Sequence, residues 1–316
     1  MRVYNQGEYS DSVTFYLLKE ISHAQTDPLM AEKYARMLIE KAEEASSKRA
    51  LLSGYLQLGN ALILKGDHNE ALEAYFKSMS YAQDFEDVSL EGALYISIAD
   101  VYSSTGSSAD ASLYYNKGIA LLRQTSDSLS LAKALLNTGD EYLNLEKYDS
   151  ALIYFRESSE IFEKKNFLLV KAYNLGNIGI AYASTGQNER AEININEAIN
   201  ILEDLEDYYP ISVYLTYMAN IYEQKDEKEQ ALNYAQRSLE LSEKYNLKEQ
   251  VRDASLTLSD LYKNFDQYDS AYVYYRKFIA YRDSLINIEQ VKELANISTD
   301  FKVSLKQAEV DLLNQQ

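Results

Sequence analysis

The apolar and small residues of the chain recur with a single fixed period. One alanine stands at the same place in seven consecutive segments: Ala31, Ala71, Ala111, Ala151, Ala191, Ala231 and Ala271. Seven alanines in one register are very unlikely to arise by chance. The chain is therefore predicted to consist of repeated units of one kind, stacked along the sequence.

Three further columns share this register and predict two helices in each repeat. Nine residues before the alanines stand Leu62, Tyr102, Tyr142, Tyr182, Tyr222 and Tyr262. Three residues earlier the positions hold small residues: Gly59, Ala99, Gly139, Gly179, Ala219 and Ser259. Four residues after most of the alanines comes a large residue, for example Tyr75 or Phe155. A small residue on the first helix allows close approach to the second helix, where the alanine receives it.

These columns resemble the tetratricopeptide repeat, which has the same small, tyrosine, alanine and aromatic positions. The resemblance implies an all-α, right-handed superhelix of about seven helix pairs without strands. We expect a capping pair over residues 10–45, six repeats over 50–281 and a long helix over 282–316. Two departures stand out: the period is 40 rather than about 34 residues, and the family's helix-ending proline is missing from every repeat.

The first helix of each repeat carries a second, polar stripe on the side away from its partner helix. Its members follow one helical face, which in a tetratricopeptide array lines the concave surface. We take these residues as the candidate ligand-binding set: Gln57, Asn60, Asp100, Lys133, Asn137, Asp140, Tyr173, Asn177, Tyr217, Asn220 and Asp260. An ordinary solvated helix face is the alternative interpretation.

Side-chain chemistry and net charge indicate which ligand this stripe would accept. Amide side chains can donate hydrogen bonds to a peptide backbone and accept them from it. The formal charge of −18 and the three stripe aspartates disfavour acidic peptides, nucleic acid and anionic membranes. We therefore expect a neutral or basic peptide or protein in the groove, with no nucleic-acid binding and no membrane insertion by this fragment.

Signals for catalysis are missing from the sequence. There is no cysteine, and the two histidines, His23 and His68, have no partner at metal-ligand spacing. Asp100 and Asp140 could form an acid/base pair across neighbouring repeats, which is the weakest of the interpretations. We expect no catalytic residue, no metal and no cofactor.

The segment from residue 282 to 316 has apolar positions with coiled-coil spacing: Leu294, Ile297, Phe301, Leu305, Ala308 and Leu312. A homodimer through this seam and a helix that caps the last repeat both remain open. The run Tyr281-Arg282-Asp283-Ser284-Leu285, with Glu289, Phe301, Lys306, Glu309 and Leu312, resembles the end of the sensor region in Bacteroidetes tetratricopeptide signalling proteins.

That second resemblance implies a periplasmic sensor domain of a regulator, with a histidine kinase or a LuxR-type DNA-binding domain as its output. The sequence shows neither a signal peptide nor a membrane span, so an exported protein would be represented here by a trimmed ectodomain. A cytoplasmic peptide-pheromone receptor resembling the Rap family is the alternative. Residues 1–45 count against it, because they hold about one helical pair. A passive assembly scaffold is the third possibility.

Overall fold

The computed structural model describes residues 9–165 and 167–285, and all regular structure in these ranges is α-helical. The expectation of an all-α fold without strands is thus confirmed for this part of the chain. Its helices are α1 (Asp11–His23), α2 (Pro28–Glu44), α3 (Lys48–Lys65), α4 (His68–Gln83), α5 (Val88–Ser104), α6 (Ser108–Leu122), α7 (Ser128–Asn144), α8 (Tyr148–Lys165), α9 (Leu168–Ser184), α10 (Asn188–Asp204), α11 (Tyr208–Gln224), α12 (Lys228–Lys244), α13 (Lys248–Asn264) and α14 (Tyr268–Leu285).

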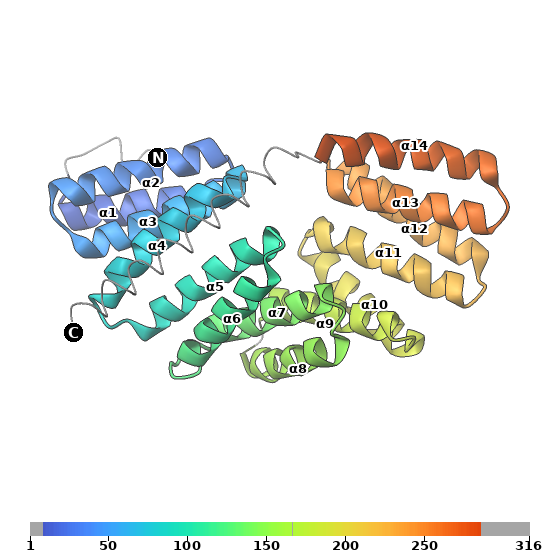
Figure 1. The fold of residues 1–316 in the computed structure, drawn as a ribbon, viewed down its shortest axis with the longest axis horizontal. Coiled ribbons are helices and arrows are strands. Elements are labelled where there is room, and N and C mark those ends of the chain that lie inside the picture. Colours follow the sequence, from blue (N-terminus) through green and yellow to red (C-terminus); the bar gives the residue numbers. More distant parts are fainter. Residues whose placement is uncertain (1–8, 166, 286–316) are drawn as a thin grey trace. The chain divides into compact units, whose positions relative to one another are not determined.

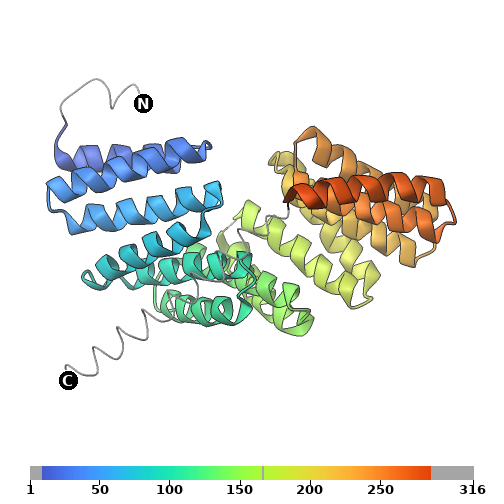
Figure 2. The ribbon, with the colours of Figure 1, turned by 45° about the horizontal axis from the view of Figure 1, so that its top comes forward.

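The helices form two compact units along the chain. The first unit ends at Asp127 and contains α1 to α6, while the second begins at Ser128 and contains α7 to α14. Within each unit, every odd-numbered helix packs against the even-numbered helix that follows it, and that helix packs against the next odd-numbered one. Figures 1 and 2 show these antiparallel pairs in each unit, coloured in chain order.

The small-residue column packs as expected, although its partner is not the alanine itself. A Cβ atom added at Gly59 would overlap the ring of Tyr75, and one added at Gly139 would overlap the ring of Phe155. Both rings stand four residues after the repeat alanine, on the even-numbered helix of the same pair. The glycine therefore makes room for a large side chain, and the alanine is buried beside it.

Tyrosines of the second column stack on tyrosines of the neighbouring even-numbered helix. The ring centroids of Tyr142 and Tyr154 are 5.3 Å apart with an interplanar angle of 11°. The same sequence offset joins further pairs: Tyr102 with Tyr114, Tyr222 with Tyr234 and Tyr262 with Tyr274. The aromatic column thus joins the two helices of one repeat.

Serine hydroxyl groups form a second link inside the helix pairs. Ser78, Ser158 and Ser238 are fully buried and share one position of the repeat. Each donates to a backbone carbonyl 26 residues earlier, on the odd-numbered helix of its own pair, over 2.9, 2.8 and 2.7 Å respectively. These bonds satisfy a buried polar atom and hold the two helices of the pair at close distance.

The turns between helices contain residues in the left-handed conformation at regularly spaced positions. These residues have φ between 51° and 87°: Ser46, Gly66, Glu86, Gly106, Glu146, Gly186, Glu206, Asp226, Asn246 and Asp266. Most are followed by an amide that donates back to a carbonyl near the end of the preceding helix, as Asp67 does to Leu62 over 2.9 Å. This C-terminal motif ends the helices, which explains why the repeats need no helix-ending proline.

Helix starts agree only in part with the sequence. Asp67 and Ser107 precede α4 and α6 and belong to residue types that commonly cap helices, but neither side chain caps its helix. The Asp67 carboxylate instead pairs with Lys65 over 2.8 Å. Side-chain caps are formed at other turns, where Asp27 accepts from the Leu29 amide and Asp87 accepts from the Leu90 amide.

No helix in the described residues has both the length and the hydropathy that a membrane crossing requires. The last described helix, α14, includes the first residues of the expected C-terminal segment. The apolar seam from Leu294 to Leu312, and with it the coiled-coil and capping alternatives, lies outside the described residues.

Candidate functional site

The stripe residues are carried by odd-numbered helices of both units. Gln57, Asn60 and Asp100 belong to α3 and α5 of the first unit, and the other eight belong to the second unit. In the second unit, α7 contacts α9, α9 contacts α11, and α11 contacts α13. The stripe positions of these four helices therefore share one face of the second unit, which we call the inner face.

Asn177 is the centre of a hydrogen-bond network on the inner face. Its Nδ2 donates to Asp140 Oδ1 over 3.2 Å, which joins α9 to α7. Its Oδ1 accepts from the hydroxyl of Tyr214 over 3.3 Å, and the same hydroxyl lies 3.2 Å from the backbone oxygen of Tyr173. Because both ends of this amide are engaged, Asn177 joins three helices and sets the shape of the face.

The buried Tyr214 is part of this network and is not in the stripe predicted from the sequence. It is only 2% exposed, and burial raises the pKa of its phenol. A Cβ atom on Gly176 would overlap the Tyr214 ring. Gly176 is thus needed to make room for this ring. In the sequence, a glycine in one repeat and a large residue in the next were the signal that could have identified this contact.

Tyr173 and Asp207 add a second link between α9 and the start of α11. The Tyr173 hydroxyl donates to Asp207 Oδ2 over 2.8 Å. Burial and this hydrogen bond both raise the pKa of Tyr173, so the phenol is protonated and acts as a donor at neutral pH. The link orients the Tyr173 ring at the edge of the inner face.

Two further tyrosines present phenol groups in a negative field. Tyr217 is half-buried and Tyr209 is 47% exposed. Burial raises the pKa of both phenols, and the charges of Asp140 and Asp253 raise both further. Glu249 also raises the pKa of Tyr209. The inner face therefore combines aromatic rings with carboxylates, and sequence reasoning did not include Tyr209 among the site residues.

The remaining stripe residues of the second unit differ in their environment. Lys133, Asn220 and Asp260 are exposed, and Asn137 is half-buried. Lys133 is the one basic residue among the stripe positions chosen from the sequence, whereas Asp140 and Asp260 bring two carboxylates to the same face. On α13, Glu249 adds a further carboxylate near Tyr209, whereas Asp253 is already paired with Arg252 over 2.6 Å. A ligand on this face therefore meets more carboxylates than basic groups.

Stripe residues of the first unit are used within their own repeats. Gln57 is buried, at 5% exposure, beside a cavity of about 270 Å³. Asn60 accepts from the Tyr75 hydroxyl over 2.8 Å, and Asp100 accepts from the Tyr115 hydroxyl over 2.7 Å. These bonds position the side chains locally. The corresponding place opposite Asp140 is occupied by a phenylalanine, which leaves Asp140 available to Asn177.

Groups with catalytic or metal-binding potential are sparse in the described part of the chain. Its histidine and acidic residues form no cluster of three that could hold a metal ion. Burial lowers the pKa of His68, which favours the neutral imidazole at the start of α4. Asp100 and Asp140 belong to different units and already accept bonds from Tyr115 and Asn177.

Comparison with known proteins identifies the class of repeat. One tetratricopeptide-repeat family model matches residues 168–244, and another matches residues 52–85 and 132–165. The chain therefore contains tetratricopeptide repeats, as its repeated columns predict. The fold is a protein-interaction fold.

The Regulatory protein RapG of Bacillus subtilis (strain 168) is 24% identical to the chain over 174 residues. This alignment covers 54% of the chain and 47% of RapG, which is less than half of that protein's length. The structure of a Rap protein complexed with competence and sporulation factor is similar, with a TM-score of 0.64, 15% identity and 90% of each chain covered.

A tetratricopeptide repeat protein from Parabacteroides merdae ATCC 43184 is also similar. Its TM-score is 0.59 at 18% identity, and the match covers 91% of the chain and 99% of that structure. At such identities, the likeness to solved structures establishes the fold alone.

Proposed function

We propose that the chain is a non-catalytic binding and sensor domain of a signal-transduction or transcription regulator, which holds an extended peptide or protein segment on the inner face of its second unit. The observation that supports this most is the joining of α7, α9 and α11 through Asn177. That network builds a continuous surface on which Tyr173, Tyr209 and Tyr217 present aromatic and phenolic groups.

The chemistry of this surface favours a neutral or basic segment. Phenol hydroxyls and exposed amides such as Asn220 can bond the backbone of an extended peptide. The rings supply apolar contact at low cost in side-chain entropy. Carboxylates of Asp140 and Asp260 attract a lysine or arginine side chain and repel acidic sequences, whereas Asp253 is already paired with Arg252 over 2.6 Å.

The test selects peptides from a random library displayed on phage and measures their binding by calorimetry. Selected peptides should be depleted in aspartate and glutamate. Tyr217→Ala or Asp260→Asn should weaken binding at least tenfold. Tyr272→Ala is the matched control, since Tyr272 is an exposed tyrosine on α14, an even-numbered helix. Selection of acidic peptides, or an equal loss in Tyr272→Ala, would contradict the proposal.

A Rap-like peptide receptor is the second candidate, because the RapG match and the solved Rap complex favour it. The two candidates share a peptide-binding surface and differ in location. The first places the domain in the periplasm, as the resemblance of residues 281–312 implies, and the second places it in the cytoplasm. Fusion of the native reading frame to alkaline phosphatase separates them, because that enzyme is active only after export.

A further inference from the structure

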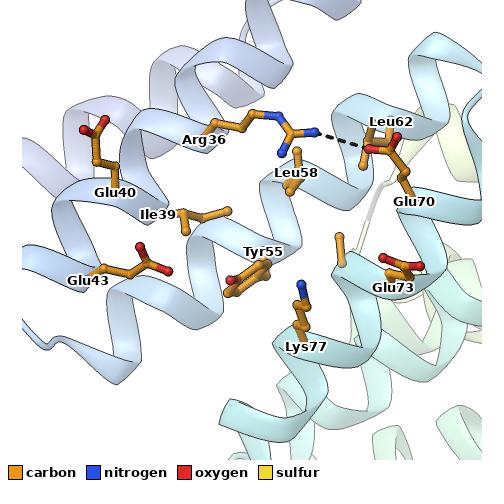
Figure 3. Close-up of a pocket in the computed structure, with 11 residues that line it drawn as sticks. Arg36, Ile39, Glu40, Glu43, Tyr55, Leu58, Leu62, Glu70, Glu73 and Lys77 are labelled. Atoms are coloured by element: carbon orange, nitrogen blue, oxygen red, sulfur yellow. Dashed lines mark hydrogen bonds and ion pairs between the residues drawn. The ribbon is translucent and has the colours of Figure 1, made fainter. Parts of the chain in front are cut away.

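A cavity in the first unit lies between α2 and α4 with α3 beneath it, and none of the predicted stripe residues lines it. Its volume is about 310 Å³. Tyr55, Leu58 and Leu62 of α3 form its floor, together with Ile39 and Ala74 (Figure 3). This floor can pack against a methylene chain, but it offers few hydrogen-bonding groups.

Carboxylates stand on both walls of the cavity. Glu40 and Glu43 project from α2, and Glu70 and Glu73 project from α4 on the opposite side (Figure 3). Among these, only Glu70 has an ion pair with another described residue. Its carboxylate lies 3.3 Å from Arg36, which also binds Glu32 over 2.8 Å. The negative charge of the other three is not offset by a described ion pair.

An aromatic ring at the bottom of the cavity already faces an ammonium group. The Lys77 Nζ atom lies 5.4 Å from the centroid of the Tyr55 ring. Tyr55 in turn stacks on Tyr81, with centroids 6.1 Å apart and an interplanar angle of 13°. Burial raises the pKa of Tyr55, and the charge of Glu43 raises it further. The ring is therefore held in place, and it is suited to a cation.

We propose that this cavity binds a linear aliphatic diamine or polyamine. An ammonium group at each end would meet the carboxylates of one wall, and the methylene chain between them would cover the apolar floor. The two-sided placement of the acids favours this ligand over a lysine side chain of a partner protein, which carries a single ammonium group and satisfies one wall. Relief of repulsion between the glutamates adds to the attraction.

The experiment titrates spermidine and cadaverine into the full chain by calorimetry at low ionic strength. We expect saturable binding with one molecule per chain. The double variant Glu40→Gln, Glu73→Gln should bind at least tenfold more weakly, because it removes one carboxylate from each wall. Butylamine, with one ammonium group, should also bind at least tenfold more weakly than cadaverine. Both substituted residues are exposed, so circular dichroism should be unchanged.

Two further variants test whether the site prefers positive charge and whether binding occurs in this cavity. Lys77→Met should strengthen diamine binding several-fold, since it removes a like charge from the cavity. Glu240→Gln is the matched control, because Glu240 occupies on α12 the repeat position of Glu40. Absence of saturable binding, equal binding of butylamine, weaker binding by Lys77→Met, or an equal loss in Glu240→Gln would each overturn the proposal.

Discussion

At the residue scale, the glycine and tyrosine that meet between α9 and α11 are a compensating pair. Gly176→Ala places a methyl group in the space of the Tyr214 ring. We expect the free energy of unfolding to fall by about 1–3 kcal/mol through overpacking. Urea denaturation measures the loss. The double variant Gly176→Ala, Tyr214→Leu should recover part of it, and strictly additive effects would show that the two residues are not coupled.

Asn177 provides a second test, because its amide is shared between three helices. Asn177→Ala removes the bonds to Asp140 and Tyr214 and should cost about 1–3 kcal/mol of stability. Asn220 is the control, since it is an exposed asparagine of the same stripe. Asn220→Ala should change the unfolding free energy by less than about 0.5 kcal/mol. Equal stability of the two variants would contradict the structural role of Asn177.

The different behaviour of these asparagines marks the limit of sequence reasoning. Periodicity places Asn177 and Asn220 on one face and predicts them both as ligand-binding residues. Whether an amide is engaged depends on Tyr214, which comes from another repeat and belongs to no polar stripe. Such partners are set by packing across helices. The set of binding residues predicted from the sequence stays a prediction, and Tyr209 was missed because the chosen stripe begins one helical turn later, at the repeat position of Tyr173.

At the scale of the helix pair, more of the structure could be predicted from the sequence than at the scale of single binding residues. Each column is a local pattern within one repeat, so its small, aromatic and alanine positions translate directly into packing between consecutive helices. Gly59 and Gly139 are examples, since both face a ring on the next helix. The left-handed turn residues were harder to predict from the sequence, because this position is filled by acidic residues as well as by glycine.

Substitutions at two of these left-handed turn positions are predicted to change the free energy of unfolding in opposite directions. Glu146 has φ 57°, which is strained for a residue with a Cβ atom. Glu146→Gly should raise the unfolding free energy by about 0.5–1 kcal/mol, since relief of strain exceeds the added entropy of the unfolded chain. Gly106→Ala, at φ 76°, should lower it by about 1 kcal/mol. Urea midpoints at unchanged slope would measure both, and a stabilising Gly106→Ala would contradict the argument.

At the scale of the whole molecule, buried tyrosines link stability to pH in both units. Burial raises the pKa of Tyr75 and Tyr102 in the first unit and of Tyr173 and Tyr214 in the second. The pKa of Tyr222 is raised mainly by its hydrogen bond to Glu192 and further by burial. Unfolded tyrosine ionises near pH 10. The stabilisation is therefore complete below pH 10, and it is lost as the pH rises toward the higher folded-state values.

We expect the unfolding free energy to be nearly constant between about pH 7 and 9 and to fall above about pH 10. Absorbance in the near ultraviolet follows phenolate formation, and circular dichroism follows the helices in the same titration. Part of the phenolate signal should appear together with the loss of helix. Full ionisation of all 29 tyrosines while the helices persist would contradict this prediction.

The regular spacing of the left-handed turn residues also bears on how such a protein acquires new specificity. Helices of similar length alternate with short turns, and left-handed positions recur in step with the repeats at most of the described turns. An inserted residue in a turn would disturb the bond that ends the helix and the start of the next one. Ligand preference in such a protein is therefore expected to change through substitutions on the helix faces. In contrast to antibodies, which vary their loops, a lineage built on this repeat changes its partners while the length of every repeat is kept.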